Sequence, residues 1–448
     1  MSTRSAEAQS GTETGASGTR ALDRLLAEIR AREEVIRQGG GPRGIERQHK
    51  LGRLTARERI ALLCDPQEGS GFGVQGCGAE SGRIENRKSK IENESPQSAR
   101  GAPRRNPQFF ELGLWAAEGM YAEVGGVPAA GVITGLGRVM GRLCVIVAND
   151  ATVKAGAFFP MTCKKVLRAQ RICLENKLPI IYLVDSAGVF LPMQDEIFPD
   201  EDDFGRIFRN NAVISAAGVP QIAAIMGNCV AGGGYLPVMC DTLLMTEGSG
   251  LYLAGPALVK AAIGQTSTSE ELGGAKMHAA VSGTIDYREP NDELCIERLR
   301  RLIGRLGAPP ACPFDRVAPL APKRPAERIY DIVIGANVAQ PPPAVPKQVS
   351  ASLTQPGAAV PQGQYDVREL LEHLLDAGSF DEYKAEYGQS LVCGFARLDG
   401  WAIGVVANQR KQVRPARGPI QFPSVIYVDS ADKATRFILD CNQMKTPI

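Results

Sequence analysis

The stretch that decides the fold is QIAAIMGNCVAGGGY, which runs from Gln221 to Tyr235. Its first part, Gln221–Met226, is mostly apolar without regular alternation, which predicts a strand buried on both faces. Its second part, Gly227–Tyr235, is a turn of small residues that contains the glycine run Gly232–Gly234. Small residues after a strand let a ligand approach the backbone and leave N–H groups free to point at it. The stretch therefore predicts a strand that ends at a ligand-binding turn.

A second strand and turn of the same kind lie upstream. The apolar run Ile180–Val184 leads through Asp185 into the turn Ser186-Ala187-Gly188. Two backbone N–H groups that converge on one oxygen form an oxyanion hole, which stabilises the enolate of a thioester by several kcal/mol. The alternative is that the glycines only permit close packing between a helix and a strand.

The wider pattern around both turns is that of an α/β protein. Between Phe109 and Arg305, apolar strands such as Cys144–Ala148 alternate with helices such as Thr162–Asn176. Alternation of this kind with buried strands predicts repeated β-α units.

Composition divides the rest of the chain into segments. Residues 69–107 lose all periodicity, which predicts an inserted loop, and residues 306–364 are rich in proline, which predicts a linker. Thr55, with Glu58 three residues later, predicts the first turn of a helix at Leu54–Leu63. The expected organisation is a disordered start with an N-terminal helix (Ala21–Arg37) at 1–45, a first domain at 46–305, the linker at 306–364, and a second domain at 365–448.

The second domain repeats part of the first. Gly137–Gly141 resembles Ala396–Gly400 in sequence, and each is followed by an apolar run that ends in asparagine. Further on, the interval from Leu167-Arg168 to Pro179-Ile180 is matched in length by Thr435-Arg436 to Pro447-Ile448. Two matches in the same order predict a duplicated unit.

The second copy is expected to be truncated. Its sequence stops where the strand before its own glycine turn should begin. We therefore expect its helix, Ala431–Met444, to leave an apolar face without its full core, with Phe437, Ile438 and Cys441 exposed or misplaced.

Charge and cysteine content exclude several classes of protein. The formal net charge of +2 argues against nucleic-acid binding, and no apolar run approaches the roughly 20 residues that span a bilayer. The Ser-, Thr- and Gly-rich residues 1–20 lack the apolar segment of a secretory signal.

Eleven cysteines occur singly, without a CxxC pair, which predicts reduced thiols in a cytoplasmic protein. The three histidines do not share ligand spacing, so no metal site is expected.

No obvious side-chain base accompanies the two turns. Cys229 has apolar neighbours, which favour an inert core thiol, and His278 is interpreted as a packed or capping residue. No Ser/His/Asp or Cys/His constellation is therefore visible in this stretch.

Taken together, five segments resemble the carboxyltransferase (beta) subunits of biotin-dependent acyl-CoA carboxylases, and most of all those of methylcrotonyl-CoA carboxylase, a ligase of leucine degradation. The resemblance runs from about Glu46 to Ile448. It is carried by Asn149–Lys154, Tyr182–Gly188, Phe198–Phe208, Ala231–Gly234 and Tyr252–Pro256.

The resemblance implies a crotonase-like (ClpP/crotonase) fold that is duplicated. The N-terminal half would hold the CoA ester and the C-terminal half would receive carboxybiotin, with an active site formed between two subunits of a homo-oligomer. Biotin would be carried on a partner that combines biotin carboxylase and biotin carboxyl carrier, and ATP would drive the holoenzyme. Neither a metal in this subunit, nor nucleic acid, nor a membrane is implied. Freed of CO2, biotin itself would take the substrate proton, which accounts for the absence of a side-chain base.

The resemblance also assigns candidate site residues. Tyr235 stands where hydratases of this fold carry a glutamate, which disfavours water activation. The candidate catalytic residues are Ala231, Gly232 and Gly233, and the candidate substrate-binding residues are Lys154, Gly156, Ser186, Ala187, Gly188, Gly234 and Tyr235.

Several alternatives to a methylcrotonyl-CoA carboxylase remain open. They are a propionyl-CoA or acetyl-CoA carboxylase subunit, a subunit of a biotin-dependent acyl-CoA decarboxylase, and an inactive, truncated assembly subunit. The acidic segment Phe198–Phe208 resembles the methylcrotonyl type more than the propionyl type, which favours a branched enoyl-CoA substrate.

Overall fold

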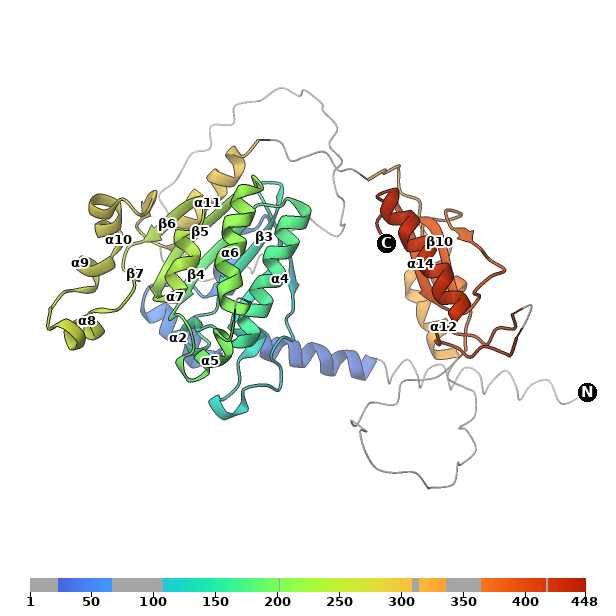
Figure 1. Cartoon of the computed structure of the whole chain (residues 1–448), viewed down its shortest axis with the longest axis horizontal. Helices are drawn as coiled ribbons and strands as arrows, with labels where there is room; N and C mark the ends of the chain where they lie inside the picture. Colours follow the sequence, from blue (N-terminus) through green and yellow to red (C-terminus); the bar gives the residue numbers. More distant parts are fainter. Residues whose placement is uncertain (1–22, 67–107, 201, 308–313, 336–363, 416–417) are drawn as a thin grey trace, which may run out of the picture. The chain divides into compact units, whose positions relative to one another are not determined.

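A computed structural model of the chain describes residues 23–66, 108–200, 202–307, 314–335, 364–415 and 418–448. The chain divides into two compact units (Figure 1). One unit comprises Arg30–Pro309, and the other comprises Pro310–Ile448 with Met1–Ile29. Each unit is described by itself. The region expected as an inserted loop, residues 69–107, lies outside the described residues.

The first unit is built on one mixed sheet. Its strands among the described residues are β1 (Phe109–Leu112), β2 (Val132–Val139), β3 (Arg142–Asn149), β4 (Ile180–Ser186), β5 (Gln221–Val230), β6 (Thr242–Thr246), β7 (Gly250–Tyr252) and β8 (Tyr287–Glu289). The strand order is β1-β2-β3-β4-β5-β6-β8, and β7 pairs with the end of β5. β1, β2 and β3 are antiparallel neighbours, whereas β3, β4, β5, β6 and β8 run parallel. The α/β class predicted from the sequence is confirmed.

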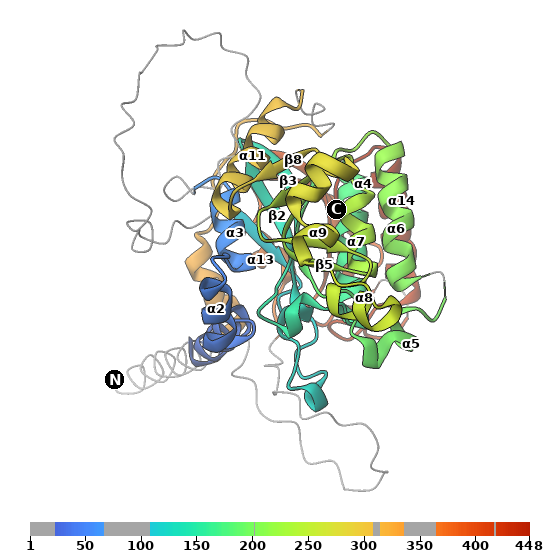
Figure 2. The same ribbon diagram turned by 90° about the vertical axis from the view of Figure 1, so that its left-hand side faces the viewer.

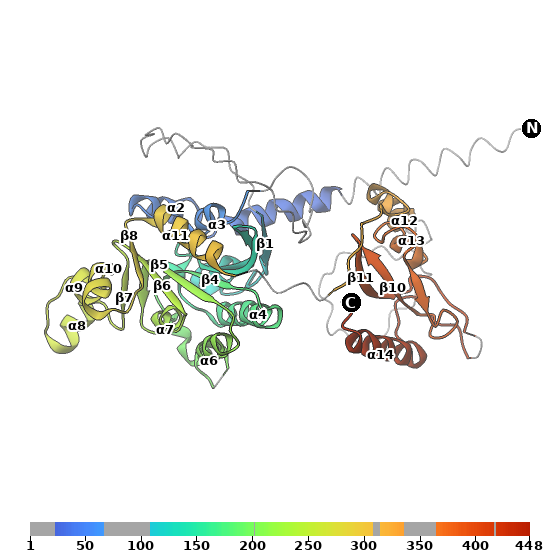
Figure 3. The same ribbon diagram turned by 90° about the horizontal axis from the view of Figure 1, so that it is seen from above.

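Helices cover both faces of this sheet, as Figure 3 shows. α3 and α11 pack on one face, and α4 and α6 lie side by side on the other (Figures 2 and 3). The longer helices of this unit are the part of helix 23–37 that follows Ile29, α2 (Gly41–Lys50), α3 (Ala56–Leu63), α4 (Pro160–Asn176), α6 (Asp203–Ala216), α8 (Pro256–Ile263) and α11 (Asp292–Arg305). The shorter helical elements are η2 (Ala122–Val124), η3 (Pro128–Gly131), η4 (Lys154–Gly156), η5 (Leu191–Met193), α5 (Gln194–Ile197), α7 (Gly232–Val238), α9 (Ser269–Gly273), α10 (Ala275–Met277) and η6 (His278–Ser282).

The central strands are apolar because both of their faces are covered. Every residue of β4 is buried, and alternate residues of the strands join two separate cores. Ile180 and Tyr182 join the core beneath α4 and α6, whereas Ile181 and Leu183 join the core beneath α3 and α11. This two-sided burial explains the runs without alternation in the sequence.

Local sequence signals predicted the start of α3 but did not predict α2. Thr55 forms the predicted capping box with Glu58 at the start of α3. α2 was not predicted, and its segment opens with a glycine and a proline, Gly41-Pro42. Proline is nevertheless favourable in the first helical turn, where its missing N–H would have no partner.

The described cysteines are free thiols, as predicted, and most are buried. Burial raises the pKa of Cys64, Cys144 and Cys173 to about 12 and raises those of Cys163, Cys229, Cys240 and Cys295 further. The pKa of each buried thiol is higher in the folded state than in the unfolded state. The contribution of such a thiol to the free energy of unfolding is fully present below the unfolded pKa and is lost as pH rises toward the folded pKa. Stability should therefore fall above about pH 9, where unfolded thiols ionise.

A variant can isolate one thiol from this alkaline loss of stability. Cys144→Ala should remove about 1 kcal/mol of the loss in unfolding free energy between about pH 9 and pH 10, because a thiol that ionises only in the unfolded state contributes at most about 1.4 kcal/mol per pH unit and is not yet fully ionised at pH 9. Urea unfolding with a reductant at both pH values measures the difference, whatever the variant's absolute stability. Burial lowers the pKa of Lys165 to about 8, so the contribution of this lysine to stability rises with pH. That contribution is the same in the wild type and in Cys144→Ala, so it cancels when their pH slopes are compared. Equal pH slopes for the two proteins would contradict the assignment.

The second unit has a small antiparallel sheet with a long helix packed on it. Its elements are η7 (Ala326–Arg328), α12 (Ile329–Gly335), α13 (Val367–Leu371), β9 (Asp381–Tyr383), β10 (Leu391–Leu398), β11 (Trp401–Asn408) and α14 (Val428–Gln443), and the strand order is β11-β10-β9. Part of the expected linker contacts this unit, since Val317 donates to Gly400 O and Ala402 donates to Asp315 O.

The same order of elements occurs in both units. The series α3-β1-β2-β3-α4 in the first is matched by α13-β9-β10-β11-α14 in the second, with the same antiparallel pairings. Asp65 accepts the N–H of Gly141 at 2.7 Å, and Asp376 accepts that of Gly400 at 2.9 Å.

Buried lysines and the ends of the matched segments correspond as well. Lys165 Nζ lies 2.7 Å from the first carbonyl of β2, and Lys433 Nζ lies 3.0 Å from the first carbonyl of β10. Pro179 O accepts a backbone N–H of β3, and Pro447 O accepts one of β11. These contacts fit the duplication suggested by the sequence.

One expectation about the second unit was wrong. Phe437 and Cys441 are fully buried, rather than exposed, and pack with Leu391 and Cys393 of β10. They are four residues apart and so share one face of α14, whereas Ile438 points away and is 44% exposed. The small sheet alone is sufficient to cover the main apolar face of this helix.

Candidate functional site

The fold brings the two predicted turns together. β4 and β5 are parallel neighbours, so their carboxyl ends lie at the same edge of the sheet. An added Cβ at Gly233 would lie 3.2 Å from Gly188 Cα, and one at Gly188 would lie 2.7 Å from Val230 O. Gly188 also has a φ of +89°, a conformation that favours glycine. Close backbone approach therefore requires glycine at position 188, whereas a Cβ at position 233 would need Gly188 to shift by a few tenths of an ångström.

The glycine run forms the start of α7 and presents free donors. Ala231 precedes this helix with φ 51° and ψ −126°, and its N–H donates to Tyr252 O. Gly234 donates to Ala231 O. No acceptor within the described part of the chain is assigned to the N–H of Gly232 or Gly233. Gly232 is partly exposed and Gly233 is buried, so the N–H of Gly232 is the one that a ligand can reach directly.

The other turn uses its own N–H groups internally. Ala187 donates to Ala155 O at 2.9 Å, and Gly188 donates to the buried Ser186 Oγ at 3.1 Å. Donors from both turns therefore do not face one oxygen in this structure. The first turn instead holds η4 in place, since an added Cβ at Gly156 would lie 2.1 Å from Asp185 O.

The candidate residues differ in exposure. Ser186, Gly188, Gly156, Gly233 and Gly234 are buried and shape the backbone. The exposed candidates are Lys154, Ala187, Ala231 and Tyr235.

Tyr235 projects from α7 as a half-exposed aromatic side chain. Its ring packs edge-on against Phe208, with ring centroids 5.6 Å apart. Phe208 in turn packs on Phe204, whose ring lies beside Gly232, because an added Cβ there would be 2.6 Å from Phe204 Cε1. The glycine turn is thus backed by an aromatic cluster.

A buried ion network behind the turns was not predicted. Arg59 of α3 is 1% exposed, and its Nε donates to Asp292 at 2.8 Å. Its guanidinium also lies 3.3 Å from Asp185 and donates to Met226 O at 2.8 Å. Asp185 directly precedes the Ser186 turn, so Arg59 ties the ends of β4 and β5 together.

A sequence signal for this network existed. Ala56, Arg59, Ile60 and Leu63 fall at helical spacing on one face of α3, and the other three are apolar and buried. An arginine within such an apolar stripe indicates a buried partner.

Other titratable groups near the turns are committed to structure. Burial raises the pKa of Asp185, while Arg59 opposes the rise. Cys229 Sγ contacts Gly233 O, and burial raises the pKa of that thiol. His278 contacts Leu251 O at 2.7 Å and Ser282 Oγ at 2.8 Å, which confirms its interpretation as a packed residue.

A hollow of about 280 Å³ lies beside the turns. We call it the α2 hollow, because one side is formed by α2 and the residues that follow it. It is lined by Arg47, Gln48, Leu51, Arg53, Ala151, Ala155, Asp185, Ala187, Asn228 and Val230.

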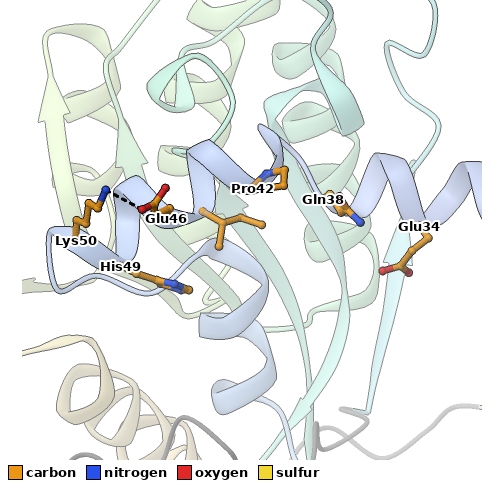
Figure 4. A pocket seen from close by; sticks show the side chains of 7 residues that line it. Glu34, Gln38, Pro42, Glu46, His49 and Lys50 are labelled. Carbon is orange, nitrogen blue, oxygen red and sulfur yellow. Dashed lines mark ion pairs between the residues drawn. The ribbon is translucent and has the colours of Figure 1, made fainter.

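A larger hollow of about 680 Å³ lies along helix 23–37 and α2 (Figure 4). Its lining includes no residue of either turn. Two of its charged side chains pair with each other, since Lys50 Nζ lies 2.7 Å from Glu46 (Figure 4). His49 pairs with Glu58 outside the hollow.

The described residues contain neither a metal-binding cluster nor a membrane-spanning helix. No group of three or more His, Cys, Asp or Glu side chains there could hold a metal ion. No helix among them is long and apolar enough to cross a bilayer.

Comparison with known proteins identifies the family. A family model described as "Carboxyl transferase domain" matches residues 108–448. The sheet, the paired turns and this match define the class, and the chain belongs to the carboxyl transferase domain family.

Two curated relatives of the chain are beta subunits of methylcrotonyl-type carboxylases. The chain is 39% identical over 426 residues to a biotin-dependent 3-methylcrotonyl-coenzyme A carboxylase beta1 subunit of Mycobacterium tuberculosis, covering 95% of this chain and 66% of that protein. It is 34% identical to the methylcrotonoyl-CoA carboxylase beta chain of Arabidopsis thaliana, covering 97% of this chain and 62% of that protein. The chain thus spans less than two thirds of the length of these curated relatives.

A solved structure agrees with this placement. The beta subunit of geranyl-CoA carboxylase from P. aeruginosa matches with a TM-score of 0.64 and 27% identity, covering 100% of this chain and 68% of that one. The crotonase-like fold expected from the sequence is therefore confirmed.

Proposed function

We propose that this chain is the carboxyltransferase component of a biotin-dependent acyl-CoA carboxylase, which moves a carboxyl group from carboxybiotin to the enolate of an acyl-CoA. The family and the named relatives support the class of reaction. The observation that carries the proposal is the pair of free N–H groups at Gly232 and Gly233, placed against the Gly188 turn.

These donors fit the carbonyl oxygen of a thioester. When the α or vinylogous γ proton leaves, negative charge develops on that oxygen, and two fixed N–H groups stabilise it without reorganisation. Ala187 lines the α2 hollow, and Gly232 is partly exposed, so neither residue covers its own backbone with a large side chain. Lys154, Gly156, Ser186, Ala187, Gly188, Gly234 and Tyr235 would shape the surrounding substrate site.

The proton is not taken by a described side chain in this proposal. Asp185 is held by Arg59, and Cys229 and His278 are buried and already bonded. Carboxybiotin, when bound, supplies the carboxyl group and, on losing it, the base that accepts the proton. The enolate carbon of the CoA ester, whose oxygen is held by the Gly232 and Gly233 N–H groups, would be the atom that receives the carboxyl group.

Two halves of the chain would divide this work. Residues 46–305 would hold the CoA ester, and residues 365–448 belong to the half that receives carboxybiotin. One local feature fits the repeat of the first half in the second, because Ser424, before α14, has a φ of +62° and stands where Gly156, with a φ of +68°, stands before α4. A partner subunit would carry biotin and biotin carboxylase, and a homo-oligomer would bring the two halves together. The free thiols fit a cytoplasmic location.

The proposed acyl substrate is 3-methylcrotonyl-CoA. Methylcrotonyl-type relatives match at 34–39% identity, whereas a propionyl-CoA carboxylase beta chain of Cereibacter sphaeroides matches at 30%. In the enzyme assembled with its biotin-carrying partner, kcat/KM should be higher for 3-methylcrotonyl-CoA than for propionyl-CoA. A higher value for propionyl-CoA would assign the chain to the second type.

Binding to the isolated chain tests the first half of the proposal. Titration with 3-methylcrotonyl-CoA carrying a 13C-labelled thioester carbonyl should give saturable binding and a downfield shift of the carbonyl resonance, because hydrogen bonds polarise the C=O group. Binding without a shift would mean that no donors face the carbonyl. Absence of any binding would contradict the proposed function.

A further inference from the structure

Two buried lysines occupy equivalent positions in the two repeated series of elements. Lys165 of α4 is 6% exposed, and Lys433 of α14 is fully buried. Both donate to main-chain carbonyls rather than to carboxylates. Removing an ammonium group from water is strongly unfavourable, so lysines are rarely found in such places. Two of them at equivalent positions indicate a role beyond filling the core.

Lys165 holds a turn with a strained backbone. Its Nζ donates to Ala129 O at 3.0 Å and to Val132 O at 2.7 Å. Ala129 and Ala130 have φ values of 50° and 56°, in the left-handed region that alanine disfavours. Thr162, also on α4, donates to Ala130 O at 2.6 Å. Two side chains of α4 therefore hold η3 in a conformation that its own sequence does not favour.

This turn anchors the loop that leads to the candidate site. Gly131, the last residue of η3, accepts the N–H of Asp150 at 3.0 Å. The segment that begins at Asp150 runs into η4, where Ala155 O accepts the N–H of Ala187 at 2.9 Å. A shift of Gly131 would therefore move the segment that positions the Ala187 turn.

The second unit repeats this arrangement. Lys433 donates at 3.0 Å to the carbonyl of Leu391, at the start of β10. The preceding residue, Ser390, accepts the N–H of Gln409 at 3.0 Å, and Gln409 O accepts that of Ser424. In both units a helix lysine fixes the first residue of a strand. The residue before it then anchors the loop that leads back to the same helix.

We propose that Lys165 and Lys433 are positioning residues for carboxyl transfer. Lys165 sets the loop beside the CoA ester, and Lys433 sets the loop in the half that receives carboxybiotin. Neither lysine touches a substrate, because each Nζ is turned to backbone carbonyls within its own unit. The inference rests on the proposed function and adds that each half positions its substrate loop independently.

Replacing each lysine by methionine separates the two roles, because methionine fills a similar space without the donors. The assembled enzyme is assayed for carboxyl transfer, and the chain is titrated with 3-methylcrotonyl-CoA that carries the 13C-labelled carbonyl. Lys165→Met should lower turnover about 100-fold, the effect of a displacement of about 1 Å in a site. It should also move the bound carbonyl resonance toward that of the free ester. Lys433→Met should lower turnover similarly but leave the affinity and the resonance of the bound ester unchanged.

An exposed lysine next to Lys165 provides the control. Lys164 is exposed on α4, so Lys164→Met should match the wild type in both measurements. Wild-type turnover of Lys165→Met or of Lys433→Met would overturn the proposal. Equal changes of the bound carbonyl resonance in these two variants would also overturn it, because the lysines would then act only through the stability of the whole chain.

Milder variants decide the question if a methionine variant does not fold, as judged by its thermal melt. Thr162→Val and Ser430→Ala remove equivalent hydroxyls, which donate to Ala130 O and to Tyr427 O. Each should lower turnover about tenfold, and only Thr162→Val should move the bound carbonyl resonance. Wild-type turnover of the variant that replaces the unfolded one would overturn the proposal. Failure of the wild-type chain to bind the ester, or of the wild-type assembly to transfer carboxyl groups, would instead overturn the proposed function.

Discussion

Replacing Gly232 by valine should lower kcat about 100- to 1000-fold, the loss found when one oxyanion donor is removed. A Cβ at this position would lie 2.6 Å from Phe204 Cε1, so the backbone or the ring must move. The N–H of Gly232 then no longer points at the thioester oxygen. Affinity for the CoA ester should change much less, because the donor acts mainly on charge that develops during the reaction.

A matched glycine tests whether this loss is specific. Gly205 lies in α6, and an added Cβ there has only Asp200 O nearby, at 4.0 Å. Gly205→Ala should therefore keep its turnover. Carboxyl transfer by the assembled enzyme and ester affinity are measured for both variants. If Gly232→Val retains turnover within a few-fold, the glycines serve only to pack the helix against the strand.

Replacing Arg59 by leucine should lower the free energy of unfolding by about 3–5 kcal/mol, the usual effect of removing one partner from a buried ion network. Asp185 and Asp292 would remain buried near each other without a positive charge. Arg59→Lys should recover part of the loss, because a lysine restores the charge but not the planar fork that reaches both carboxylates. Urea denaturation measures the free energies of unfolding of the wild type, Arg59→Lys and Arg59→Leu, which should fall in that order.

A second arginine on the same helix provides the control. Arg57 pairs with Glu111 at 2.8 Å but is partly exposed. Arg57→Leu should cost clearly less than Arg59→Leu, because the Arg57–Glu111 pair keeps contact with solvent and only one carboxylate loses its partner. Similar losses for Arg57→Leu and Arg59→Leu would contradict the special role of the buried network.

The sequence predicted the central sheet because its signal is local. β4 and β5 are apolar runs without alternation, and burial on both faces requires that pattern wherever such a strand lies. The capping box at Thr55 is equally local. α2 was missed because its propensity is poor and its position depends on contact of Gly40 with Thr152.

The site was predicted in outline but not in its hydrogen bonds. Small residues after two strands were enough to place Gly188 and Gly233 in contact, since parallel strands end at one edge. Which N–H groups stay free depends on a distant acceptor, Ala155 O, which takes the N–H of Ala187. Partners 126 residues apart, such as Arg59 and Asp185, likewise cannot be paired from one sequence.

Transfer of a labelled carboxyl group tests the central claim most directly. The assembled enzyme is supplied with its partner carrying 14C-carboxybiotin and with 3-methylcrotonyl-CoA. The proposed function predicts that the label moves to the CoA ester and that Gly232→Val stops this movement while the ester still binds. Label that stays on the biotin carrier of the wild-type assembly, or that transfers equally well in the Gly232→Val assembly, would contradict it.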